Sequence, residues 1–256
     1  MAIDIRKPLK KFLPHLLSAR EQNLNEADTV HRIVKAFETV LGYDLMTDLT
    51  REMQMKDKYV DLAVRIDGRI RFLIEVKAAT VDLRDRHIEQ AERYAAENNI
   101  RWVLLTDGIT WNLYHLTFEE GIEYSRAFSV NAADTAQFEE CAACLALLHR
   151  TSVKRDALEE FWAHKVALSA DSIGRSLFHE DTLRLLRRQI RKREELSVDE
   201  EDLAKAIHDM LSVEAREVIG PLKIRRARAP RTPRKRADVV AAEEARTAHE
   251  ETDDAE

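Results

Sequence analysis

Two carboxylates and a lysine occur in one short stretch of the sequence, YVDLAVRIDGRIRFLIEVK. Asp61 lies in a first run of alternating apolar residues, and Glu75 and Lys77 lie in a second run. Carboxylate oxygens are the ligands that hard divalent cations prefer in proteins. Two carboxylates and an ammonium close to a core are costly to desolvate unless they hold a cation or each other. These residue types therefore predict a metal site with an additional positive charge.

The stretch that contains these residues predicts a β-hairpin. Apolar residues alternate with polar or small residues from Val60 to Ile66 and again from Ile70 to Val76, and Asp67-Gly68 separates the two runs. Two alternating runs around such a dipeptide are typical of a hairpin. If both apolar rows cover one core, even-numbered residues must pair with even-numbered ones, because a slip of one residue turns a row to the opposite face.

That parity also constrains the turn. A two-residue loop would pair Ile66 with Arg69 and split the apolar rows. We therefore expect a three-residue loop with Gly68 in the left-handed region, in which Arg65 pairs with Arg69. This register sets Asp61 diagonal to Glu75, on the face of the hairpin that the apolar rows do not occupy.

A predicted helix follows the hairpin, from Leu83 to Asn98. His87, Gln90 and Tyr94 lie at spacings of three and four residues and so share one face of this helix. One interpretation is the polar face of a surface helix with a single tyrosine. The other is a functional face turned towards the hairpin, on which Gln90 orients a metal-bound water or a phosphate and Tyr94 supports it.

These residues resemble the PD-(D/E)xK nuclease motif. Asp61, followed after a spacer by Glu75-Val76-Lys77, has the order of that motif, although Val60 stands where a proline often precedes the first acid. Gln90 with Tyr94 is similar to the Gln-x-x-x-Tyr element of one branch of the superfamily.

A wider set of residues resembles the N-terminal nuclease domain of type I restriction enzyme R subunits, over roughly residues 20 to 120. The additional residues are Asn25-Glu26-Ala27-Asp28-Thr29, Leu41-Gly42-Tyr43 and Thr106-Asp107-Gly108. The resemblance implies a restriction-endonuclease-like α/β fold, with a mixed β-sheet flanked by helices, and a nuclease that acts on DNA.

The resemblance also implies roles for individual residues. Asp61, Glu75, the Val76 carbonyl and Glu26 would bind one or two Mg²⁺ ions, for which Mn²⁺ could substitute. Lys77 would orient or deprotonate the attacking water and offset the charge that develops on the phosphate.

Glu26 has a second interpretation that the sequence leaves open. Asn25 is a good N-cap for a helix whose apolar stripe ends near Gly42, so Glu26 could be an acid in the first turn that the helix dipole favours.

The remaining elements predict an α/β core over residues 1–132. The predicted strands besides the hairpin are Leu45–Met55, Trp102–Thr106, Trp111–Leu116 and Glu123–Val130. A helix between the third and fourth strands implies a right-handed crossover and a mixed sheet with helices packed on it. The continuous apolar run at Trp102–Thr106 is typical of a buried central strand.

Residues 133–219 predict a helical extension. The candidate helices are Phe138–His149, Val153–Leu168, Thr182–Glu195 and Val198–Leu211, the last with a cap within Ser197–Glu200. Basic residues interleave with apolar ones in the third of these helices, which indicates either a solvated face or contact with nucleic acid. Cys141 and Cys144 lie in a helical pattern without a second pair, which favours core packing over a zinc site.

Residues 220–256 have few large apolar side chains and predict a disordered tail, basic and then acidic. Its basic half could hold a phosphate backbone through charge alone. The basic residues are Lys223, Arg225, Arg226, Arg228, Arg231, Arg234, Lys235 and Arg236.

The composition bounds the class of protein. The 256 residues are 45% hydrophobic, with a net charge of −6 that averages over opposed blocks. The longest apolar runs are short, and Met1 to Lys11 carries charges where a signal peptide would be apolar, so we expect a cytoplasmic protein without a membrane segment.

The sequence is consistent with three functional hypotheses. The first is a stand-alone, Mg²⁺-dependent endonuclease of the restriction or defence kind, because no Gly-x-x-x-x-Gly-Lys-Ser/Thr segment of an ATP-driven motor occurs. Its substrate would be DNA, and protein partners could supply sequence recognition. The second is a catalytically silent nuclease-like module that binds nucleic acid or a partner protein. The third is an α/β scaffold in which Lys77 merely pairs with Glu75 or Asp61.

Overall fold

The structure is a computed structural model that describes residues 3–55, 58–119 and 121–226. Contacts divide the chain into two compact units, residues 1–167 and 168–256. The sequence-based boundary after residue 132 falls inside the first unit, and the separate folding of residues 1–132 stays a prediction. The predicted tail beyond residue 226 lies outside the described residues.

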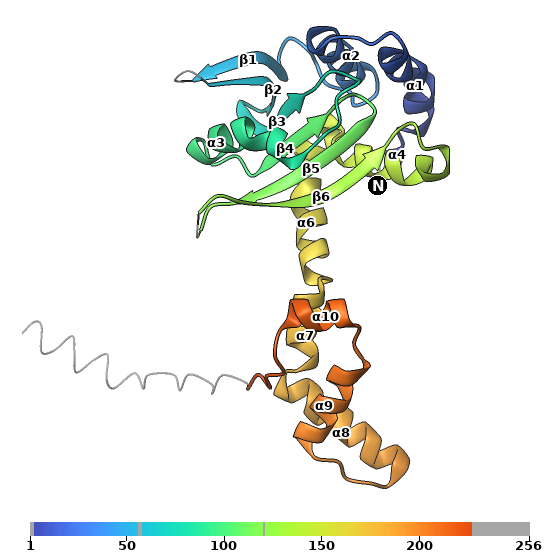
Figure 1. The fold of residues 1–256 in the computed structure, drawn as a ribbon, viewed down its shortest axis with the longest axis vertical. Helices are drawn as coiled ribbons and strands as arrows, with labels where there is room; N and C mark the ends of the chain where they lie inside the picture. Colours follow the sequence, from blue (N-terminus) through green and yellow to red (C-terminus); the bar gives the residue numbers. More distant parts are fainter. Residues whose placement is uncertain (1–2, 56–57, 120, 227–256) are drawn as a thin grey trace, which may run out of the picture. The chain divides into compact units, whose positions relative to one another are not determined.

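One mixed sheet is the centre of the first unit (Figure 1). Its six strands lie side by side in chain order, with β3 and β4 parallel and all other neighbours antiparallel. The strands are β1 (Leu49–Met55), β2 (Lys58–Ile66), β3 (Arg69–Val76), β4 (Trp102–Thr106), β5 (Thr110–Thr117) and β6 (Glu123–Asn131). The predicted α/β class with a mixed sheet is confirmed.

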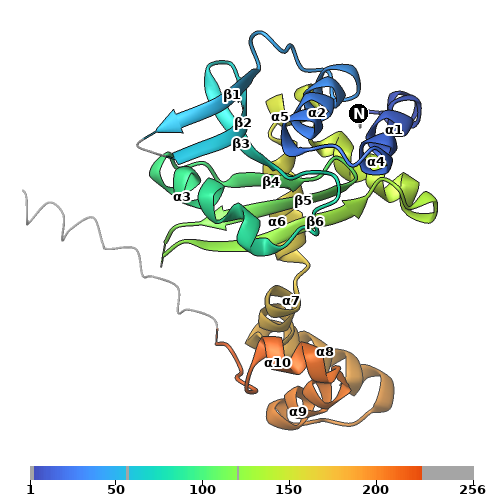
Figure 2. The same cartoon turned by 45° about the horizontal axis from the view of Figure 1, so that its top comes forward.

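Helices cover both faces of this sheet (Figures 1 and 2). One face is covered by α1 (Arg6–Glu21), α2 (Glu26–Thr39), α4 (Phe138–Leu147), α5 (Arg150–Lys154) and α6 (Ala157–Ala167), and a short 3₁₀ turn, η2 (Thr135–Gln137), precedes α4. The other face is covered by η1 (Asp85–Ile88), a second 3₁₀ turn, and by α3 (Glu89–Glu97). The connection from β3 to β4 therefore runs through a helix, as the parallel pairing requires.

Each face of the sheet has its own apolar core. Leu104 of β4 packs in the cluster that contains Phe37 of α2, whereas Val103 and Leu105 pack in the cluster that contains Tyr94 of α3. A strand buried on both faces needs a continuous apolar sequence rather than an alternating one. The prediction of a buried central strand at Trp102–Thr106 is thereby confirmed.

The turn between β2 and β3 differs from the predicted three-residue loop. Ile66 pairs with Arg69 across a two-residue turn, and both turn residues have positive φ, 51° at Asp67 and 79° at Gly68. Positive φ at both positions suits the twist of the flanking strands. The predicted pairing of Arg65 with Arg69 is wrong.

A β-bulge restores the parity of the apolar rows. Arg65 pairs with Ile70 but Val64 pairs with Phe72, so Arg71 is the extra residue on β3. Beyond the bulge, even-numbered residues face each other as the apolar pattern predicts. The bulge turns Ile70 to the opposite face, where it packs against the α3 cluster.

Two of the predicted helices are divided in the structure. The helix expected over Leu83–Asn98 is the 3₁₀ turn η1 followed by α3. The helix expected over Val153–Leu168 is interrupted between α5 and α6 by Asp156, which has φ 58°. A left-handed residue cannot continue an α-helix, and the chain changes direction there.

The second unit is helical, as predicted. It contains α7 (Ala170–Leu177), α8 (Glu180–Glu194), α9 (Glu200–Met210) and α10 (Val213–Ile219), of which α7 and α10 were not expected. The cap of α9 is Asp199, which accepts the Glu201 N–H at 2.8 Å, rather than a capping box on Ser197. Within the described residues, no helix combines the length and the apolar character needed to cross a membrane.

Part of the predicted tail and part of the basic helix contribute to this unit. The Arg225 N–H donates to the Phe178 carbonyl at 2.8 Å, and the Glu180 N–H donates to the Arg225 carbonyl at 2.8 Å. Arg187 of α8 donates to the Val198 carbonyl at 2.9 Å and forms an ion pair with Glu200 at 3.6 Å. Arg187 therefore links α8 to the start of α9.

Candidate active site at the end of β3

Asp61 of β2 lies beside the end of β3. Extending the register by one residue from the pair Leu62–Ile74 sets Asp61 opposite Glu75, not diagonal to it as predicted. The Val76 N–H donates to Asp61 Oδ2 at 2.7 Å. This hydrogen bond holds the Asp61 carboxylate, which β2 carries, beside the end of β3, the strand that carries Glu75.

Glu75 is a buried carboxylate, with a side chain that is only 7% exposed. Its Oε1 accepts a hydrogen bond from Lys77 Nζ at 2.6 Å, whereas its Oε2 is buried and has no partner within the described residues. Burial, together with the charge of Asp61, raises the pKa of Glu75 to about 7 although Lys77 acts in the opposite direction. This carboxyl therefore ionises near neutral pH.

Lys77 lies between two carboxylates. Its Nζ is 2.6 Å from Glu75 Oε1 and 3.7 Å from Glu26 Oε2, and its backbone N–H donates to the Thr106 carbonyl at 2.9 Å. Burial acts to lower the pKa of Lys77, but the hydrogen bond to Glu75 and the surrounding carboxylate charges outweigh it and raise that pKa. The side chain is thus held as an ammonium.

Glu26 fits the first of the two interpretations, an acid in the first turn of a capped helix, and it also contacts the candidate site. Asn25 caps α2 by accepting the Asp28 N–H at 2.8 Å, so Glu26 is an acid in the first turn. The same side chain, half exposed, forms the ion pair with Lys77. Its role as a metal ligand stays a prediction.

The residues fit a divalent cation only in part. No group of three or more His, Cys, Asp or Glu side chains in the described part of the chain is arranged to hold a metal ion. Two hard oxygen donors are nevertheless adjacent, and the buried, unpartnered Oε2 of Glu75 is the atom that a cation would satisfy. Asp61 and Glu75 therefore fit such an ion as two of its ligands, and the Val76 carbonyl stays a predicted third ligand.

The two residues predicted on α3 differ in their surroundings. Tyr94 is buried in the cluster that contains Val60 and Leu73, and burial raises the pKa of its phenol. Gln90 lies on the exposed side of the helix, and His87 lies outside the helix, in η1. The catalytic role of Gln90 and the supporting role of Tyr94 stay predictions.

Arg20 of α1 is a residue that the sequence did not single out. Its Nε donates to the Ala79 carbonyl at 3.0 Å, just after Lys77, and another of its guanidinium nitrogens is 3.2 Å from Asp107 Oδ2. The carboxylate of Asp107 is buried and also accepts the N–H groups of Ile109 at 2.8 Å and Thr110 at 2.6 Å. A buried acid in a turn between two strands needs such donors. The Asp107-Gly108 turn was therefore the one signal in the sequence that pointed to a donor such as Arg20.

Leu41-Gly42-Tyr43 has a structural role. The Tyr43 hydroxyl donates to the Leu148 carbonyl at 2.7 Å, and the Arg150 N–H donates to the Leu41 carbonyl at 2.9 Å. Gly42 has φ 73°, and a Cβ there would lie 2.9 Å from the His149 ring. These residues join the end of α2 to α4 and α5.

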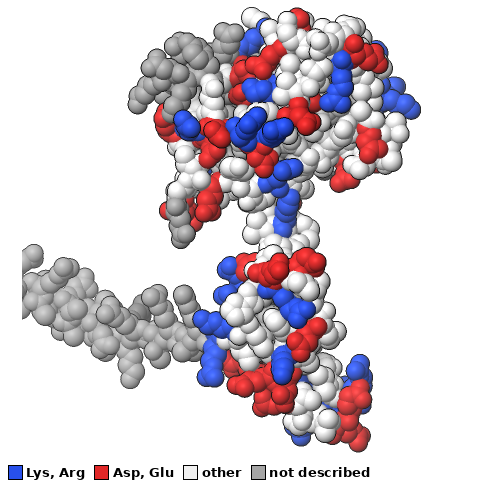
Figure 3. Space-filling view, viewed as in Figure 1, with Lys and Arg blue, Asp and Glu red and all other residues white. Residues whose placement is uncertain are grey.

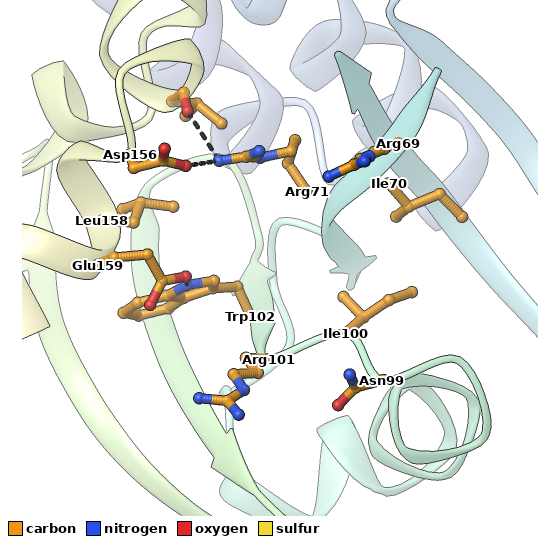
Figure 4. Close-up of a pocket in the computed structure, with 11 residues that line it drawn as sticks. Arg69, Ile70, Arg71, Asn99, Ile100, Arg101, Trp102, Asp156, Leu158 and Glu159 are labelled. Atoms are coloured by element: carbon orange, nitrogen blue, oxygen red, sulfur yellow. Dashed lines mark hydrogen bonds and ion pairs between the residues drawn. The ribbon is translucent and has the colours of Figure 1, made fainter. Parts of the chain in front are cut away.

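A separate cleft of about 240 Å³ lies at the opposite ends of β3 and β4 (Figure 4). Arg71 reaches across it to the carboxylate of Asp156 and donates to the Val153 carbonyl at 3.2 Å, and Trp102 Nε1 donates to Glu159 at 2.7 Å. These acids are already engaged in holding the α5–α6 turn against the sheet. The cleft is therefore part of the packing between the sheet and these helices.

The predicted nucleic-acid-binding residues of the tail are divided by the limit of the described residues. Lys223, Arg225 and Arg226 are described, and all three are exposed. The others lie outside the described part of the chain: Arg228, Arg231, Arg234, Lys235 and Arg236.

A comparison with known protein families finds a match within the first unit. Residues 30–126 match the family described as "Type I restriction enzyme R protein N terminus (HSDR_N)". No curated protein and no solved structure matches the chain. The matched segment contains Asp61, Glu75 and Lys77 and spans most of the sheet. The predicted resemblance is thereby confirmed for this segment, which carries a restriction-enzyme-related domain.

Proposed function

We propose that the chain is a metal-dependent endonuclease that hydrolyses DNA phosphodiester bonds, of the restriction or defence kind. The observation that supports this most directly is the convergence of Asp61, Glu75 and Lys77 at the end of β3, within the segment that matches the restriction-enzyme family. The sequence contains no phosphate-binding segment of an ATP-driven motor. A cytoplasmic location stays a prediction.

Two carboxylates would hold the metal in this proposal. A bound Mg²⁺ or Mn²⁺ ion lowers the pKa of its water and neutralises charge on the scissile phosphate. Asp61 is fixed in place by the Val76 N–H. Glu75 supplies an oxygen that is already desolvated, and its raised pKa means that metal binding would release a proton near neutral pH. The Val76 carbonyl and Glu26 are the further proposed ligands.

Lys77 would stabilise charge rather than act as a base. Because its carboxylate neighbours raise its pKa, the side chain carries its proton at neutral pH and cannot accept another one. Its ammonium would instead orient the attacking water and offset the negative charge that develops on the phosphate. Gln90 would assist in orienting that water or the phosphate, and Tyr94 would support α3 from within the core.

Nucleic acid is the proposed partner of both the site and the tail. The basic residues from Lys223 to Arg236 would hold phosphates without regard to sequence. Because no reader of base edges is recognisable, recognition of a DNA sequence would fall to protein partners.

A silent binding module is the second candidate function. Lys77 already bonds to Glu75 and pairs with Glu26, so the ion pairs of the site are satisfied without a substrate. This observation favours a nuclease-like domain that binds DNA or a partner protein without cleaving it.

Cleavage of supercoiled plasmid in Mg²⁺ separates the two candidates. We expect nicking by the wild type and a loss of about 100-fold or more in Lys77→Ala, the scale for removing a preorganised charge-stabilising group. Lys154→Ala is the matched control, because that exposed lysine pairs with Asp67 away from the site. Absence of cleavage with intact DNA binding would favour the silent module. Cleavage that survives in Lys77→Ala would place the activity elsewhere.

A further inference from the structure

A hollow between α1 and α2 is lined by basic side chains without an acid. It has a volume of about 770 Å³, and none of its lining residues is Asp or Glu. Its basic residues are Lys11, His15, His31, Arg32 and Lys35. Lys35 forms an ion pair with Glu38, which lies outside the lining. Since the whole chain has a net charge of −6, a groove lined by basic residues and by no acid still departs from the average charge of the molecule. Such a local field favours a polyanion.

The exposed face of α1 extends this positive surface. Lys7, Lys10 and Lys11 line an adjoining hollow between α1 and α4, whose one acid, Glu139, lies 3.5 Å from Arg6. Within the described residues, none of these three lysines forms an ion pair. The first turn of α1 contains no acid, although positive charge at a helix N-terminus is unfavourable. Asp4, just before α1, accepts the Arg6 N–H at 3.0 Å and forms an ion pair with the Arg6 guanidinium, so it compensates Arg6 but not the three lysines. Figure 3 shows basic side chains over α1, at the right of the first unit.

The walls of the hollow are fixed by hydrogen bonds. Arg32 of α2 donates to the Ser18 hydroxyl at 2.6 Å and to the Gln22 amide oxygen at 3.2 Å, both on or just after α1. Leu16 and Phe37 of the same helices are buried against the sheet, so the hollow faces solvent. A polyanion would therefore meet a preformed surface and would order few side chains on binding.

The two helices that line the hollow also contact the candidate active site through other residues. Arg20, near the end of α1, bonds to the Ala79 carbonyl at 3.0 Å, and Glu26, at the start of α2, lies 3.7 Å from Lys77. From Pro8 to Gln22 the hollow follows α1 for about 21 Å at 1.5 Å per residue. That length corresponds to about six base pairs of a duplex.

We propose that this cationic α1–α2 groove, with Lys7 and Lys10 beside it, holds the phosphate backbone of the duplex on which the Asp61–Lys77 site acts. The proposal rests on the proposed function, because it names where the substrate of that site is held. It also goes beyond the family match, since α1 lies outside residues 30–126. The groove would recognise the charge and spacing of the phosphates and would make no contact with base edges.

Salt-dependent binding of a short fluorescein-labelled duplex tests the groove. The full chain is titrated in EDTA, so that cleavage does not interfere, and fluorescence anisotropy gives the slope of log affinity against log salt. We expect the triple variant Lys7→Gln, Lys10→Gln, Lys11→Gln to reduce that slope by about 0.9 for each lysine that contacts a phosphate. The matched control removes three exposed arginines of the same unit: Arg69→Gln, Arg101→Gln and Arg155→Gln. The control should keep the wild-type slope, and circular dichroism verifies that each variant is folded.

The outcomes separate this proposal from the nuclease proposal. An unchanged slope in the lysine variant, or an equal loss in the arginine control, would overturn the groove even if Lys77→Ala abolishes plasmid cleavage. A reduced slope in the lysine variant alone would support the groove. If the wild type then showed no Mg²⁺-dependent cleavage, the groove would stand as a nucleic-acid-binding surface while the nuclease proposal failed.

Discussion

Replacing Glu75 by glutamine should change how the stability of the first unit depends on pH. Burial and the charge of Asp61 raise the pKa of Glu75 from 4.5 to about 7. In the folded chain this carboxyl keeps its proton up to about pH 7, whereas the unfolded chain releases it near 4.5. The free energy of unfolding therefore falls as pH rises through this interval and is level above it. At about 1.4 kcal/mol per pH unit, the loss is about 3 kcal/mol.

A glutamine cannot ionise, so Glu75→Gln should lack this loss while keeping an oxygen for Lys77. We expect the variant to resemble the wild type near pH 5 and to be more stable by up to about 3 kcal/mol near pH 8. Urea denaturation followed by tryptophan fluorescence measures the difference, because all three tryptophans lie within residues 1–167. Glu89→Gln, on the exposed side of α3, is the control for loss of a carboxylate. Parallel curves for wild type and Glu75→Gln would refute the assignment of a raised pKa.

The same variant tests whether the carboxylates bind a cation. Near pH 8, a cation that binds folded Glu75 and Asp61 but not the unfolded chain should stabilise the wild type increasingly as its concentration rises, with the logarithmic dependence of a ligand that binds only the folded state. Glu75→Gln should lose most of this stabilisation, because a neutral amide is a weaker ligand for a hard cation. Equal stabilisation of both proteins by Mg²⁺ would show that the ion binds elsewhere.

Two further predictions concern a motif glycine and the tail. Gly42→Ala should lower the free energy of unfolding, measured by urea denaturation, by about 2–4 kcal/mol, because Gly42 has φ 73° and the new Cβ would lie 2.9 Å from the His149 ring. The control Gly68→Ala, with φ 79° and no atom within 4 Å of the new Cβ, should lower it by only about 1–2 kcal/mol. Equal losses in the two variants would contradict the steric argument. Deleting residues 227–256 should weaken duplex binding mainly at low salt and leave cleavage at saturating DNA intact, and an unchanged salt slope would exclude the tail from binding. The basic residues removed are Arg228, Arg231, Arg234, Lys235 and Arg236.

The hairpin shows what an alternating sequence can and cannot predict. Alternation correctly gave two paired strands and the parity of their apolar rows. It could not reveal the bulge at Arg71, because Ile70 is apolar and finds a core on the other face of the sheet as well. A two-residue turn and a bulge together give the same parity as a longer loop. The register, and with it the position of Asp61 opposite Glu75, therefore needed the structure.

The sequence predicts that residues 133–219 are helical, but it does not predict where each helix begins and ends. Asp156 breaks the predicted helix from Val153 to Leu168 by adopting φ 58°, yet an aspartate is an ordinary residue on a helix surface. The short helices α7 and α10 were missed because each is close to the minimum length at which periodicity can be seen. They pack against each other where Gly174 admits Ile219, since a Cβ there would lie 2.6 Å from that side chain.

The contacts that hold the candidate site come partly from outside the segment that matches the restriction-enzyme family. Arg20 joins the Ala79 carbonyl and Asp107, which are 59 and 87 residues away along the chain, and Glu26 pairs with Lys77. Both residues precede residue 30, where the family match begins. Local patterns carry no information about contacts of such long sequence separation. The strand that carries Glu75 is thus positioned by the sheet, while Lys77 and the chain just after it are held by contacts from helices α1 and α2. Because the same two helices form the cationic groove, a duplex bound there would lie against the elements that fix Lys77.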